Sequence, residues 1–222
     1  MKPKSHFLDL YGNHNETSNA KKLIVEWLHC QLTSKTPQLA RQHLLGFYLL
    51  EPYKADNVTI RLHYWPAEQA YFPPCEEEMH DHIWSLDSYV LIGGLNNVEA
   101  DIQESPSGPW QVSIIKKIDN RESIQINPKR YKITNETRTF QKAGSRYQIS
   151  PGIFHKTEVA PEQAVVTLVR SEPLLTRPSR GLVPAGTQPY TASKGICGPV
   201  ASRRIVKEIF ELLNDPNGTL KS

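Results

Sequence analysis

Apolar side chains recur along the chain with two different periods. In residues 17–33 they recur at steps of three and four, as in an amphipathic helix: Leu23, Ile24, Trp27, Leu28 and Leu32. Residues 200–214 show the same spacing, with one apolar face: Ile205, Ile209, Leu212 and Leu213. We also expect residues 37–50 to be helical. The pattern therefore predicts helices before and after the central part of the chain.

In the central part the period changes to two. Residues 57–65 place Val58, Ile60, Leu62 and Tyr64 on one face and Thr59, Arg61, His63 and Trp65 on the other. Short strand-like runs follow, broken by Pro, Gly and Asn: 88–95, 98–102, 110–118, 123–127, 130–134, 146–150 and 164–171. Many short strands separated by turns are typical of a sandwich or a barrel. The segment 103–124 is expected to form a hairpin, because the loop SPSGP interrupts two strand-like runs.

Composition favours one globular domain. The chain has 222 residues and 38% hydrophobic residues, enough for a full core. We expect a single domain over 1–222, with a helical part at 1–50 and a β-barrel at 51–171. Residues 172–222 would form a Pro- and Gly-rich arm without a clear period, followed by the last helix.

Charge and cysteine content restrict the partners and the compartment. The 26 basic and 23 acidic residues nearly balance, so nothing indicates nucleic acid binding. The longest apolar stretch, YVLIGGL, is too short to span a bilayer. The N-terminus lacks an apolar signal core, and the three cysteines fit neither a disulfide framework nor a cysteine zinc site. We therefore expect a cytoplasmic protein.

Three histidines form the candidate metal site. His80 and His82 occupy alternate positions, so on a strand they point the same way, about 7 Å apart. A third ligand can come from His155, which follows the turn Pro151-Gly152. The alternative is that His80 and His82 end a solvated strand after an acidic run and that His155 is a turn residue.

These residues carry a resemblance to the cupin family. His-x-His, a glycine-ended apolar strand, and a distant Pro-Gly-x-x-His resemble the two cupin motifs, so a cupin-type β-barrel or jelly-roll-like sandwich is expected. Within the cupins, three stretches are most similar to the cysteine dioxygenase (thiol dioxygenase) branch: MHDH at 79–82, VLIGGLNN at 90–97 and HKTEVAPEQAVVTLVRSEP at 155–173. This branch binds ferrous iron with three histidines. Two positions depart from its pattern, since Leu168 and Arg170 stand where the family has His and Tyr.

Three further residues are candidates for catalysis or substrate binding. Asp87 stands near the motif position of a carboxylate, where it can be a fourth ligand, a hydrogen-bond partner of a ligating imidazole, or neither. Arg61 can bind a substrate carboxylate or phosphate if its strand faces the barrel interior, and is otherwise solvated. Arg170 presents the same two alternatives.

The leading hypothesis is a metal-dependent oxygenase that acts with dioxygen on a small polar substrate. Iron(II) is the expected metal, with nickel, manganese and zinc as alternatives. The other hypotheses are an isomerase, epimerase or lyase that uses the metal as a Lewis acid, and a non-catalytic protein that binds a small ligand. The N-terminal helix and the C-terminal arm can pack across a subunit boundary, so the sequence is compatible with a homodimer.

Overall fold

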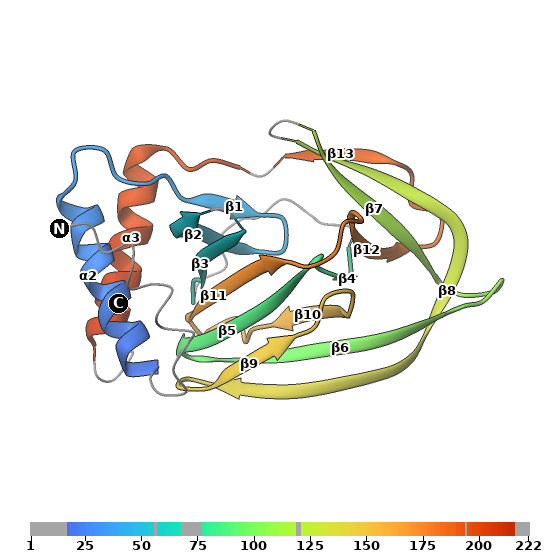
Figure 1. Cartoon of the computed structure of the whole chain (residues 1–222), viewed down its shortest axis with the longest axis horizontal. Coiled ribbons are helices and arrows are strands. Elements are labelled where there is room, and N and C mark those ends of the chain that lie inside the picture. The colour runs from blue at the N-terminus through green and yellow to red at the C-terminus, as the bar shows by residue number, and fades with distance from the viewer. Residues whose placement is uncertain (1–16, 56, 68–76, 119–120, 194, 216–222) are drawn as a thin grey trace.

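The computed structural model describes residues 17–55, 57–67, 77–118, 121–193 and 195–215. Within them the fold is mainly β, with two antiparallel sheets and two helices (Figure 1). The mainly β class and the helix on each side of the strands in the sequence are therefore confirmed. No helix among these residues is long and apolar enough to cross a membrane.

The first sheet has six strands in the order β1-β2-β3-β11-β5-β9. Their bounds are β1 Arg41–His43, β2 Phe47–Ala55, β3 Val58–Trp65, β5 Trp84–Ile92, β9 Arg146–Ile149 and β11 Val165–Pro173. The alternation expected for residues 57–65 is present in β3, where Ile60, Leu62 and Tyr64 are buried on one face. The first sheet thus has one largely apolar face and one face of mixed chemistry.

The second sheet has seven strands in the order β13-β8-β6-β10-β4-β12-β7. Their bounds are β4 Met79–His80, β6 Gly94–Glu104, β7 Trp110–Ile118, β8 Arg121–Lys142, β10 Phe154–Glu158, β12 Ser179–Pro184 and β13 Tyr190–Ser193. The long strand β8 pairs with β7 along its first half and with β6 along its second half. In Figure 1 it curves around the end of the molecule opposite the helices.

Both helices cover the apolar face of the first sheet. They are α2, Thr17–Thr33, and α3, Pro199–Asn214, and they lie side by side in Figure 1. Their buried side chains share the largest core cluster with residues of β2, β3, β5 and β11. The predicted apolar face of α3 is confirmed, since Ile205, Ile209, Leu212 and Leu213 are all buried. One face of the first sheet is therefore used for stability, and the other is left for a site.

The predicted helix at 37–50 is wrong, because these residues form the β1–β2 hairpin. The turn uses Gly46 at φ +82°, a left-handed conformation that glycine adopts without strain, and the Gly46 amide donates to the His43 carbonyl. The run LLGFYLL is apolar at nearly every position, so it lacks a clear period of either kind. The pairing of β2 with β3 favours a strand over a helix here.

Three other expectations about the strands need correction. The loop SPSGP does not close a hairpin in the segment 103–124, because the strands on either side of it, β6 and β7, both pair with β8; within that segment the end of β7 pairs with the start of β8. The runs 123–127 and 130–134 belong to one strand, β8. The arm expected after residue 171 is not wholly irregular, since it contributes β12 and β13 to the second sheet. Each correction depends on hydrogen bonds between distant segments.

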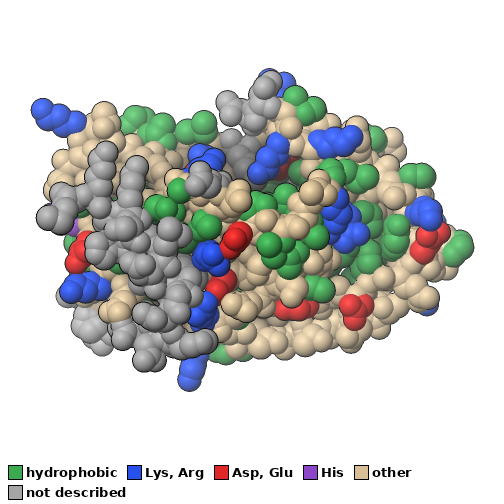
Figure 2. Space-filling view, viewed as in Figure 1, with side chains coloured by type: hydrophobic (Ala, Val, Ile, Leu, Met, Phe, Trp, Pro, Cys, Tyr) green, Lys and Arg blue, Asp and Glu red, His purple; other side chains and the backbone are tan. Residues whose placement is uncertain are grey.

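Charged groups of both signs lie on the surface. Figure 2 shows Lys and Arg side chains interspersed with Asp and Glu side chains and with hydrophobic ones on the viewed face. Some large apolar side chains are exposed as well, among them Ile118, Phe140 and Val200.

Candidate metal centre

Two short strands of the second sheet bring the three histidines together. β4 and β10 are paired antiparallel, and His155 is directly opposite His80 in the register. His82 follows the end of β4, and the Gly152 amide donates to its backbone carbonyl at 2.9 Å. The structure thus places next to each other the two halves of a motif that are far apart in the sequence.

The geometry of the histidine cluster fits a metal ion. One ring nitrogen from each of His80, His82 and His155 lies within 4.8 Å of the other two. The ring centroids are 4.5 to 4.9 Å apart, and His155 is only 2% exposed. Imidazole nitrogens are common ligands of divalent transition metals, and three of them gathered this closely could hold a single ion. The cluster can therefore hold a metal.

Burial keeps the imidazoles of His82 and His155 neutral. Burial lowers the pKa of His82 well below its usual value, and the neighbouring His80 and His155 lower it further. Burial lowers the pKa of His155 to about 4, although the Ile153 carbonyl and the Asp81 carboxylate act in the opposite direction. At pH 7 both rings are unprotonated, which is the form that donates a lone pair to a metal.

Two of the rings are also oriented by their neighbours. Nδ1 of His155 lies 3.2 Å from the Ile153 carbonyl oxygen. A carbonyl only accepts hydrogen bonds, so Nδ1 carries the proton and the lone pair is on Nε2. The ring of His82 stacks on Trp84, with centroids 4.4 Å apart and an interplanar angle of 19°. Both contacts limit rotation of a ligand ring.

A cavity of about 320 Å³ adjoins the histidines and is lined by both sheets. The first sheet contributes its mixed face, including Arg61, Trp84 and Tyr147. Cζ of Arg61 lies 5.2 Å from the centroid of the Trp84 ring, and its Nε lies 3.8 Å from Oε2 of Glu51. Burial lowers the pKa of Arg61, and Glu51 opposes that effect. A guanidinium enclosed in this way is well suited to bind a small anion.

Asp87 and Arg170 do not line this cavity. On β5 the neighbouring Leu86 lines it, so Asp87 points to the opposite face, where it accepts hydrogen bonds from Arg146 at 2.5 and 2.8 Å. On β11 Val169 lines the cavity, and Arg170 lies on the other face, with Nη2 2.7 Å from Oε2 of Glu172. The structure therefore brings Arg61 to the histidines and keeps the other two candidates away.

Sequence reasoning missed several residues around the site. Asp81 stands between the two motif histidines and is fully buried. From the sequence, strand alternation predicts only that its side chain points away from theirs, and it does not predict burial or a partner. Its partners Arg177 and Arg180 lie in the segment expected to be an irregular arm. Tyr147 on β9 and Glu51 on β2 also line the cavity, and neither was a candidate. No local signal marks any of these residues.

Comparison with known proteins does not assign the chain to a family: no protein-family model matches it, and no curated protein shows a significant match.

Proposed function

We propose that the protein is a metal-dependent oxygenase of the cupin type, with His80, His82 and His155 as the ligands of one divalent transition metal. The observation that carries the proposal is the convergence of three imidazoles beside a cavity, with the pKa values of His82 and His155 lowered by burial. The two antiparallel sheets, with the histidines on one and the cavity between them, are compatible with a cupin jelly roll.

Iron(II) is the metal that we propose, on chemical grounds. Imidazole is a ligand of intermediate softness that suits iron, zinc, copper and nickel. Among the described residues the cluster contains three histidines and no carboxylate, which would leave coordination positions open on a bound metal. Bound iron(II) would supply these positions to substrate and dioxygen.

The protein's own groups would bind and orient the substrate. Arg61 would donate hydrogen bonds to a carboxylate or another small anion of the substrate, in a site from which much of the water is excluded. Trp84 contacts both Arg61 and His82, and so would help to set the distance from the anion site to the ligand rings. Holding the substrate anion at that distance is how positioning would contribute to catalysis.

Metal analysis of untagged protein tests the proposal. We expect about one metal ion per chain, lost in His80→Ala and in His155→Ala. The exposed His29 provides the matched control, since His29→Ala should keep the metal. Near-stoichiometric metal in both ligand variants would overturn the assignment.

Oxygen uptake then separates the reaction classes. The iron-loaded protein should consume dioxygen with a member of a panel of small thiols and amino acids. Bound metal without uptake would favour the Lewis-acid isomerase or lyase, and absence of metal would favour a cavity that only binds a ligand.

A further inference from the structure

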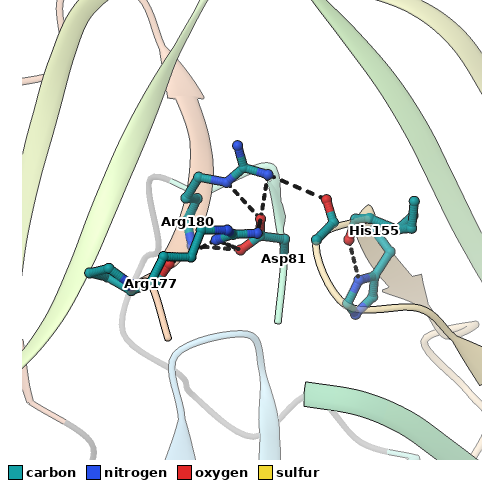
Figure 3. Close-up of polar contacts among 7 residues, drawn as sticks. Asp81, His155, Arg177 and Arg180 are labelled. Atoms are coloured by element: carbon teal, nitrogen blue, oxygen red, sulfur yellow. Dashed lines mark hydrogen bonds and ion pairs between the residues drawn. The ribbon is translucent and has the colours of Figure 1, made fainter. Parts of the chain in front are cut away.

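Asp81 is a fully buried carboxylate enclosed by two arginines. Nη2 of Arg177 lies 2.6 Å from its Oδ2, and Nε of Arg180 also lies 2.6 Å from Oδ2. Oδ1 accepts from the Arg180 amide at 2.8 Å and from Nη1 of Arg177 at 3.2 Å. Figure 3 shows the two guanidinium groups converging on this carboxylate. A buried charge with four hydrogen bonds has little freedom to move.

The same groups connect the two segments that carry the histidines. Asp81 lies between His80 and His82 in the sequence, and its own amide donates to the Arg180 carbonyl. Nη2 of Arg180 reaches the Gly152 carbonyl at 3.3 Å, in the turn that precedes His155 (Figure 3). The Gly152 amide in turn donates to the carbonyl of His82. A continuous chain of contacts therefore runs from one ligand segment to the other through Arg180.

The turn is also packed against these arginines. The guanidinium carbon of Arg180 lies 4.8 Å from the centroid of the Phe154 ring, directly before His155. A Cβ added at Gly152, which has φ +85°, would lie 3.1 Å from Nη2 of Arg177. The segment 177–180 thus contacts both Asp81 and the turn before His155, and it supplies no metal ligand itself.

We propose that Asp81, Arg177 and Arg180 are positioning residues that hold the two histidine-bearing segments at the separation a metal requires. This role rests on the proposed metal function. On this proposal β12 and the residues directly before it help to shape the metal site, because they supply both arginines.

The test compares two buried aspartates. Asp81→Asn removes the negative charge that Arg177 and Arg180 contact. Asp87→Asn is the matched control: it removes a buried charge that is paired with Arg146 and does not line the cavity. We expect Co²⁺ to bind Asp81→Asn about 10- to 100-fold more weakly, with an altered visible spectrum. Asp87→Asn should keep the wild-type affinity and spectrum. Equal behaviour of the two variants would overturn the proposal.

A milder variant covers the case in which Asp81→Asn does not fold. Arg180→Lys keeps the positive charge and loses the forked contacts to Asp81 and Gly152. We expect a shifted Co²⁺ spectrum with this variant, and an unchanged spectrum would contradict the proposed role.

A measurement without metal separates this proposal from the metal function. The ring ¹⁵N and ¹H shifts of His82 and His155 in metal-free protein should move in Asp81→Asn and not in Asp87→Asn. Wild-type protein that binds no Co²⁺ would overturn the metal function, and the ring shifts would still decide the positioning role. Unmoved ring shifts in Asp81→Asn would refute it.

Discussion

We expect the metal-free protein to lose stability in acid because His155 is buried in its neutral form. In the unfolded chain His155 has the usual histidine pKa of about 6.5. Burial lowers that pKa to about 4 in the folded protein. Between these two values the unfolded state binds a proton that the folded state does not. Stability must therefore fall as the pH decreases through this range.

The size of the effect follows from the difference in pKa. Each pKa unit corresponds to about 1.4 kcal/mol, so His155 contributes a slope of about 1.4 kcal/mol per pH unit and a total loss of about 3 kcal/mol. Above pH 6.5 neither state binds the proton, and below pH 4 both states do. The loss is therefore confined to the window between them. His82, whose pKa is also lowered by burial, should add to the slope.

Denaturant unfolding of chelator-treated protein at several pH values from 7 to 4.5 measures this slope. His155→Gln removes the titrating group while its amide can still donate to the Ile153 carbonyl. We expect the slope of this variant to be smaller than the wild-type slope by about 1.4 kcal/mol per pH unit. The variant His29→Gln, at an exposed histidine, should match the wild type. An equal dependence of the unfolding free energy on pH in His155→Gln and wild type would refute the claim that His155 is buried in its neutral form.

Three other outcomes are expected. A divalent metal at about 100 times its dissociation constant should raise the free energy of unfolding by about 2.7 kcal/mol, which thermal melts with and without chelator can test; an unchanged melting temperature would argue against binding to the folded state. Arg61→Ala should lower kcat/KM for an anionic substrate roughly 10- to 100-fold at unchanged metal content, since a hydrogen bond to a charged group contributes about 1.5 to 3 kcal/mol; equal turnover of charged and neutral substrates by wild type would exclude that role. Leu168→Ala should lower the free energy of unfolding by about 2 to 5 kcal/mol in denaturant unfolding, because Leu168 is fully buried between the first sheet and the helices. The control Val200→Ala, at an 84% exposed position, should change the free energy of unfolding by less than about 0.5 kcal/mol.

Elements with a strong period were predictable from the sequence. The apolar steps of α2 and α3 identified both helices, and alternation identified β3 and the face that it buries. In each case one side of a single element contacts the core, so the amino-acid order itself records the burial. The candidate ligands could be selected in the same way, because His80 and His82 occupy alternate positions and a Pro-Gly turn precedes His155.

Partners distant in the sequence were not predictable. Residues 37–50 carry no clear period, and pairing with β1 and with the more distant β3 makes β2 a strand. Asp87 looked like a candidate ligand from its place in the motif, but the side of β5 on which it lies turns it toward Arg146. Local pattern records which side of an element is apolar, and it does not record what lies opposite.

The sequence by itself thus determined the two helices, most of the strands and a short list of metal-binding candidates, because these depend on neighbours within a few residues. Only the tertiary structure decided that β4 and β10 pair, so that His80 lies opposite His155. It also decided that the buried charge of Asp81 is neutralised by Arg177, 96 positions further along the chain. A buried carboxylate requires a partner, but the strand order of the whole sheet determines which residue can reach it.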